Sequence, residues 1–219
     1  MQGLEPSKTL VDQAYEVILN ALCDGTFKPG ERLTQEEIAA RLNVSRQPVT
    51  HALTVLKSQG FLEQAGRRGL MVTAVDPDFL EAIYQLRSVV EPLAVRLATP
   101  KLTKKDIQEG RALVKKGREV AKSGDSKAMQ EADMDFHSFI YNLSGNPLIA
   151  DTMQLHWNHL RRGMGKVLSS APASGIWNEH SRVLDAMIHG DADGAAELMR
   201  KHLVDAYERV RKSSDAAAT

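Results

Sequence analysis

Residues 34–60, TQEEIAARLNVSRQPVTHALTVLKSQG, decide the fold of the N-terminal part of the chain. Thr34 followed three residues later by Glu37 is the pattern of a helix-capping box, and it predicts a short helix. After a tight turn, Ser45 is a suitable N-cap for a longer helix, which we expect to stop at Gly60. Two helices joined in this way indicate a helix-turn-helix.

The longer helix has two different sides when its residues are placed at intervals of about 100°. One side gathers apolar residues such as Val49, Leu53 and Leu56, which suit burial. The other side carries hydrogen-bonding groups and no acid, as a surface that reads the DNA major groove requires. Its residues, together with His51 on the flank, are the candidate DNA-binding residues: Arg46, Gln47, Thr50, His51, Thr54 and Lys57.

On either side of this motif the pattern extends to a winged helix-turn-helix. Residues 9–24 predict a preceding helix, and residues 61–63 and 70–73 predict a strand pair around a glycine-flanked loop. Arg67 and Arg68 at the tip of this wing are expected to contact phosphates or the adjacent minor groove.

The distribution of charge supports a nucleic-acid partner for this domain, which we place at residues 1–75. The whole chain has 28 basic and 28 acidic residues, so its net charge does not indicate a nucleic-acid partner. Residues 1–40, however, carry three basic and seven acidic residues, whereas residues 41–70 carry five and one. Positive charge therefore gathers at the predicted recognition helix and wing. A winged helix that contacts other proteins is the alternative.

From Pro77 onward the pattern is helical throughout, and proline, glycine and serine mark the breaks between helices. The expected spans are 78–99, 103–123, 126–144, 147–169, 176–189 and 192–212. We therefore expect a mainly α protein, with a small β-hairpin in the winged domain, an all-α six-helix bundle over residues 76–212 and a frayed tail over residues 213–219.

Composition indicates a cytoplasmic protein without a membrane partner. Cys23 is the single cysteine, so no intrachain disulfide can form. No apolar run approaches the ~20 residues that span a bilayer. Residues 1–6 lead into no apolar stretch, so no signal peptide is expected.

Histidines in the helical domain suggest a metal site. Asp133 and His137 share one helical face about one turn apart. His180 and His202 lie at similar distances from the turn at Gly190, so an antiparallel pair of helices would bring them level. Three imidazoles and one carboxylate suit Zn²⁺, or Ni²⁺, Mn²⁺ or Fe²⁺ with added waters.

Spacing alone leaves other readings of these residues open. An Asp and a His one helical turn apart often form only a hydrogen bond with each other and bind no metal. His156 and His159 are rival ligands, and we expect them to be solvated or to line a pocket. His189, beside a turn, is expected to be exposed.

The N-terminal residues closely resemble the GntR family of regulators. The matching stretches are residues 27–33 (FKPGERL), 38–46 (IAARLNVSR), 48–49, 52–53 and 60–62. Two departures stand at Thr50-His51, where many members have Arg-Glu, and at Glu36, where many have Arg. Because both departures remove DNA contacts, the operator sequence of relatives does not carry over.

The helical domain resembles the effector domain of the FadR subgroup of that family. The matching residues are 86–87, 91–94, 133, 136–137, 144–147, 179–180, 190–191, 195–196 and 202–203. In metal-containing members an Asp and three His at these positions hold the ion, which implies Asp133, His137, His180 and His202 as ligands here. Arg87 would pair with the acid group of an effector, and a structural ion pair with Glu91 is an equally good interpretation.

The resemblance implies a transcription regulator rather than an enzyme. We expect a homodimer on a pseudo-palindromic double-stranded operator. We expect repression that a small carboxylate effector relieves at the metal site. A metal-dependent enzyme fused to a DNA-binding module, and a winged-helix protein-interaction module, are the alternatives.

Overall fold

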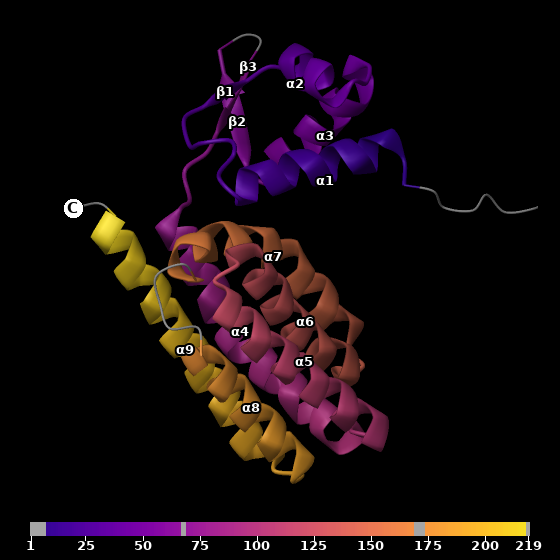
Figure 1. The fold of residues 1–219 in the computed structure, drawn as a ribbon, viewed down its shortest axis with the longest axis vertical. Coiled ribbons are helices and arrows are strands. Elements are labelled where there is room, and N and C mark those ends of the chain that lie inside the picture. Colours follow the sequence, from indigo (N-terminus) through magenta and orange to yellow (C-terminus); the bar gives the residue numbers. More distant parts are fainter. Residues whose placement is uncertain (1–7, 67–68, 169–173, 218–219) are drawn as a thin grey trace, which may run out of the picture. The chain divides into compact units, whose positions relative to one another are not determined.

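The computed structural model describes residues 8–66, 69–168 and 174–217. Its internal contacts divide the chain into two compact units, residues 1–75 and 76–219 (Figure 1). Among the described helices, none is both long enough and apolar enough to cross a membrane.

The first unit is a winged helix-turn-helix. Its elements are α1 (Leu10–Cys23), β1 (Arg32–Leu33), α2 (Gln35–Leu42), α3 (Arg46–Ser58), β2 (Leu62–Ala65) and β3 (Gly69–Val72). The antiparallel sheet has the order β1-β3-β2. The hydroxyl of Thr34 caps α2 by accepting from the backbone N–H of Glu37, and Asn43 ends it with a left-handed backbone, φ 52°. The helix-turn-helix expected from the sequence is therefore present.

Two details of this unit differ from the sequence prediction. Strand β1 was not predicted, because two residues are too short to show a strand pattern. It forms through its pairing with β3, in which Leu33 lies opposite Leu70. Ser45 is the N-cap of α3, but its side chain makes no capping hydrogen bond.

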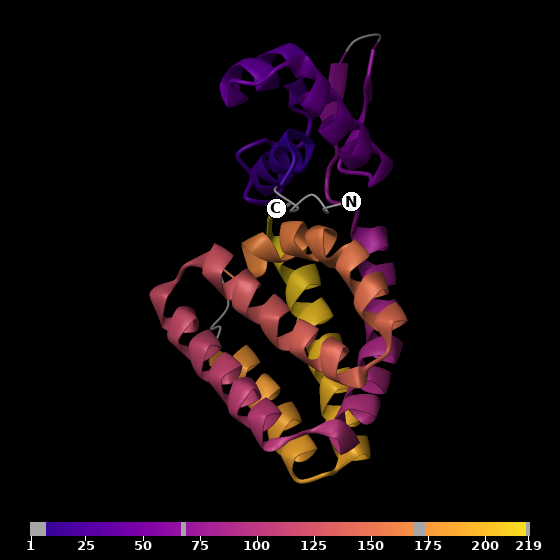
Figure 2. The same ribbon diagram turned by 90° about the vertical axis from the view of Figure 1, so that its right-hand side faces the viewer.

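The second unit is the predicted helical bundle (Figure 2). Its helices are α4 (Pro77–Ala98), α5 (Lys104–Ser123), α6 (Ser126–Ser144), α7 (Pro147–Leu168), α8 (Ser174–Ile188) and α9 (Ala192–Ala217), with a 3₁₀ turn at Thr99–Lys101. Helix α9 packs against both α4 and α8. Helix α9 extends to Ala217, beyond the expected end at residue 212, because the segment that follows contains no proline or glycine. A frayed tail over residues 213–219 stays a prediction.

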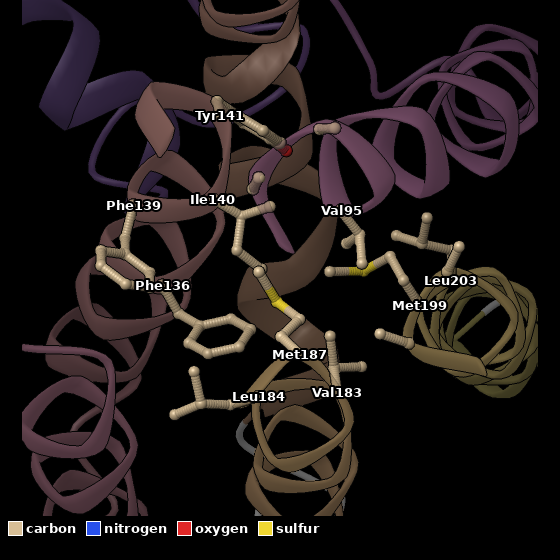
Figure 3. Close-up of a cluster of buried hydrophobic side chains, with 14 of the residues drawn as sticks. Val95, Phe136, Phe139, Ile140, Tyr141, Val183, Leu184, Met187, Met199 and Leu203 are labelled. Atoms are coloured by element: carbon tan, nitrogen blue, oxygen red, sulfur yellow. The ribbon is translucent and has the colours of Figure 1, made fainter. Parts of the chain in front are cut away.

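A buried apolar core holds these helices together. Figure 3 shows Phe136 and Ile140 of α6 beside Leu184 and Met187 of α8, and the same cluster includes Met199 of α9. Each of these side chains is more than nine-tenths buried. The core therefore fixes the relative positions of α6, α8 and α9, the three helices that carry the candidate metal ligands.

Candidate functional site

The predicted DNA-reading side of α3 faces solvent. Arg46, Gln47, His51, Thr54 and Lys57 are exposed, and Thr50 is half-buried. The opposite side, which includes Val49, Ala52, Leu53 and Leu56, is completely buried in the core of the first unit. The helix thus presents an exposed row of hydrogen-bonding groups on a rigid apolar base.

Contacts within the first unit position part of this row. The hydroxyls of Thr50 and Thr54 donate to backbone carbonyls one turn earlier, at 2.9 and 2.8 Å. Lys57 Nζ donates to Gln64 Oε1 of β2 at 2.9 Å and so ties the end of α3 to the wing. The predicted wing residues Arg67 and Arg68 lie outside the described residues.

In the second unit, α6, α8 and α9 bring four predicted metal ligands together. His180 Nε2 lies 3.2 Å from His202 Nε2 and 3.5 Å from Asp133 Oδ1, and His137 Nε2 lies 3.9 Å from the same Asp133 oxygen. One nitrogen from each of the three histidines lies within 4.8 Å of the others. The side chains of all four residues are more than nine-tenths buried.

Two glutamates hold the outer nitrogens of two of these rings. His137 Nδ1 lies 2.6 Å from Glu91 Oε2 on α4, and His202 Nδ1 lies 2.7 Å from Glu179 Oε2 on α8. The sequence prediction did not place either glutamate beside a histidine. Their partners lie 46 and 23 residues away, so no local spacing connects them, although both glutamates fall in stretches that carry the family resemblance.

Each glutamate is in turn bound by an arginine. Arg87 Nε donates to Glu91 Oε1 at 2.5 Å, which is the ion pair that the sequence left as one of two interpretations of Arg87. Arg209 of α9 donates to both oxygens of Glu179, each at 3.0 Å. Binding of an effector by Arg87 remains a prediction.

Electrostatics keep the two carboxylates ionised. Burial alone would raise the pKa of Glu91, but the adjacent Arg87 and His137 lower it well below its usual range. Burial would likewise raise the pKa of Glu179, and hydrogen bonds from His202 and Arg209 lower it.

Burial has the opposite effect on two of the histidines. It lowers the pKa of His180 strongly and that of His202 as well, because an imidazolium is poorly solvated in the interior. Neutral imidazoles are the form that binds metal ions. The electrostatics of the site therefore suit ligands rather than charged histidines.

The geometry of these side chains fits a metal ion. Zn–N bonds are about 2.0–2.1 Å long, so two nitrogens on one ion are at most about 4.2 Å apart. The distance of 3.2 Å between His180 Nε2 and His202 Nε2 satisfies this limit. His137 Nε2 is buried and has no hydrogen-bond partner among the described residues, as a nitrogen that faces an ion would be.

The remaining histidines of the second unit lie away from this group. The rings of His156 and His159 stand edge-on to Phe79, with centroids 6.1 and 5.0 Å away. His189 is exposed, as predicted, and its Nδ1 contacts the carbonyl of Asp185 at 2.7 Å. The three histidines that the sequence favoured are the three that converge.

Two further polar atoms are buried in the cluster that Leu80, Tyr84, Trp157 and Leu160 help to form between α4 and α7. Tyr84 Oη and Trp157 Nε1 have no hydrogen-bond partner among the described residues. The guanidinium carbon of Arg87 lies 5.1 Å from the centre of the Tyr84 ring. Neither residue was predicted from the sequence as a site residue, since aromatic residues at helical spacing are typical of a core.

Two family models match the chain. The model of bacterial regulatory proteins of the gntR family matches residues 10–72, and the FCD domain model matches residues 82–205. These ranges correspond to the winged unit and to the helical unit that contains the histidine cluster.

Individual proteins agree with the family models. The Nta operon transcriptional regulator of Aminobacter aminovorans is 35% identical over 130 residues, which are 58% of this chain and 60% of that protein. A probable D-xylose utilization operon transcriptional repressor of Paenarthrobacter nicotinovorans is 28% identical over 200 residues, covering 89% of this chain and 86% of the relative. The solved structure of Escherichia coli McbR/YncC superimposes with a TM-score of 0.81 at 24% identity, over 94% of this chain and 99% of that one.

Proposed function

The chain belongs to the GntR family and is a DNA-binding transcription regulator of the FCD type, and from this premise we propose that it is a repressor controlled by a small organic acid at a metal centre. The observation that supports control by a ligand is the convergence of Asp133, His137, His180 and His202 inside the FCD unit, whereas the predicted DNA-binding residues lie in the winged unit. A second ligand-binding domain is what a regulated repressor needs.

Zinc is the metal that three imidazoles and a carboxylate favour, with Ni²⁺, Mn²⁺ and Fe²⁺ as further candidates. Asp133, His137, His180 and His202 would hold it. The ion would supply a positive charge and open coordination positions for carboxylate oxygens of the effector.

The effector is proposed to extend from this centre toward Tyr84 and Trp157. Their buried hydroxyl and indole N–H lack partners among the described residues, and a buried donor without an acceptor is costly. An acid that carries a second oxygen function away from its metal-binding group would satisfy them. Hydroxy acids and sugar acids have this chemistry.

We propose that two copies of the chain bind the operator. Helix α4 exposes an apolar stripe at helical spacing, formed by Leu86, Val89 and Leu93, and Val89 is 71% exposed. Such a stripe on a long helix suits association with a second copy of the same stripe. A dimer would present two α3 helices to a pseudo-palindromic site.

A gel-shift assay against genomic fragments at rising salt tests DNA binding. Specific binding should weaken steeply with salt because phosphate contacts release counterions. The acids that raise the melting temperature of the zinc-loaded protein should then release the shifted fragment. If those acids leave the shift unchanged, control by an acid at this site is wrong.

A further inference from the structure

Two similar series of side chains contact the histidine cluster, one through His137 and the other through His202. In the first, which we call the α4 relay, Arg87 binds Glu91, and Glu91 contacts Nδ1 of His137. In the second, the α9 relay, Arg209 binds Glu179, and Glu179 contacts Nδ1 of His202. Each relay thus has the order arginine, glutamate, histidine.

The chemistry of a carboxylate fixes the proton on each of these rings. An ionised carboxylate can only accept hydrogen bonds, so the Nδ1 atom that contacts it must carry the proton. A neutral imidazole with a proton on Nδ1 has its lone pair on Nε2. In the α4 relay Nε2 of His137 faces Asp133, and in the α9 relay Nε2 of His202 faces His180.

We infer that Glu91 and Glu179 are positioning residues, which hold His137 and His202 in the tautomer and orientation that direct both Nε2 lone pairs at one ion. This inference rests on the proposed metal centre. The arginines keep the carboxylates ionised and in place: Arg87 and Glu91 are completely buried, whereas Arg209 and Glu179 are about one-quarter exposed.

His180 provides an internal contrast. Its Nδ1 is buried and has no hydrogen-bond partner among the described residues, so no carboxylate fixes its tautomer. It is held instead by stacking on Phe136, with ring centroids 4.4 Å apart. The inference therefore predicts Nδ1–H for His137 and His202. In the metal-free protein His180 then donates from Nε2 to the lone pair of His202 Nε2, 3.2 Å away.

The α9 relay allows a direct test, because its partial exposure lets Arg209 be solvated when Glu179 is changed. Long-range ¹H–¹⁵N spectra of the full-length metal-free protein report which ring nitrogen carries the proton. We expect Nδ1–H at His202 in the unsubstituted protein and in Glu179→Gln, whose amide oxygen still accepts. We expect a mixture of tautomers in Glu179→Ala. Retention of pure Nδ1–H in Glu179→Ala would overturn the inference.

Zinc affinity, measured by competition with a chelator, gives the second readout. Loss of such an outer partner typically lowers metal affinity by about 10- to 100-fold. We expect that loss in Glu179→Ala, a clearly smaller one in Glu179→Gln, and no change in Glu197→Ala, a control on α9 whose glutamate is exposed and bound to Arg200. Equal affinity of Glu179→Ala and the unsubstituted protein contradicts the inference.

The two readouts separate this inference from the proposed metal centre. If the unsubstituted protein does not bind zinc but shows the expected tautomers, the proposed centre fails and the positioning of the rings stands. For the fully buried α4 relay, Glu91→Gln is the suitable variant, because it keeps an acceptor for His137. We expect Nδ1–H at His137 to persist in this variant, and its loss would contradict the inference for the α4 relay.

Discussion

His180 Nε2 and His202 Nε2 lie 3.2 Å apart in the interior of the helical unit, and Asp133 Oδ1 lies 3.5 Å from the first of them. Two ring nitrogens at this distance can share either a proton or a metal ion. Because burial lowers the pKa of both imidazoles, the pair is poorly suited to positive charge of its own. The carboxylate of Asp133 then lies beside two neutral rings, and a bound cation would compensate its negative charge.

Metal removal should therefore lower stability. A ligand at 100 times its Kd stabilises the folded state by about 2.7 kcal/mol, so zinc should raise the melting temperature and excess EDTA should reverse the rise. The zinc-dependent rise should disappear in His180→Ala and persist in His189→Ala, whose histidine is exposed and outside the cluster. A full rise in His180→Ala would exclude this residue as a ligand.

From the predicted DNA-binding side of α3 we expect a specific dependence of operator affinity on salt concentration. Each phosphate contact contributes roughly 0.9 to the slope of log K against log salt, so losing one should lower the slope by about that amount. Arg46→Ala is expected to weaken operator binding through such a loss. Gel shifts at several salt concentrations measure the slope. Lys122→Ala, an exposed lysine of α5, is the control; an equal effect of both variants would contradict a specific role for Arg46.

Most of the fold was predictable because its signals are local. Capping residues, glycine and proline mark the ends of each helix, and the expected spans differ from the observed ones mainly at their ends. The short strand β1 could not be predicted, because its partner lies 37 to 39 residues away in sequence, as the pairs Leu33–Leu70 and Arg32–Met71 show. Long-range pairing determines such an element, not its own two residues.

The candidate site was predictable only in part. Helical spacing related Asp133 to His137, and the hairpin of the last two helices related His180 to His202. Family resemblance was needed to join the two pairs. Glu91 and Glu179 were missed as histidine partners because those contacts are made between helices, and the orientation of helices around their axes is set by packing that periodicity does not describe.

Close packing of α5 against α8 predicts a strong effect at a glycine. A Cβ atom on Gly117 would lie 2.1 Å from the Trp177 ring, whereas one on Gly175 would meet nothing within 4 Å. Overpacking of this kind costs about 1–3 kcal/mol or more. Gly117→Ala should thus lower the free energy of unfolding in urea, and Gly175→Ala should not. Equal stability of the two variants would mean that Trp177 moves aside without cost.

The buried hydroxyl of Tyr84 predicts a separation of stability from effector binding. Burial raises the pKa of Tyr84 to about 12, so the hydroxyl is a neutral donor at pH 7. Tyr84→Phe removes a group without a partner among the described residues, so it should leave the stability of the effector-free protein unchanged or higher. Calorimetry with an acid identified by thermal shift should show binding weaker by about 1–3 kcal/mol. Unchanged affinity would place the effector elsewhere.

The exposed stripe on α4 predicts where the dimer is held. Val89→Asp would place a charge at the centre of an apolar contact, where it would be desolvated without a partner. We expect this variant to sediment as a monomer while remaining folded, because the Val89 side chain is largely exposed and contributes little to the core. Its operator affinity should fall, since one α3 helix would then bind one half-site. Ala112→Asp, a change at an exposed position of α5, is the control. If Val89→Asp remains a dimer in analytical ultracentrifugation, the two chains associate through another surface.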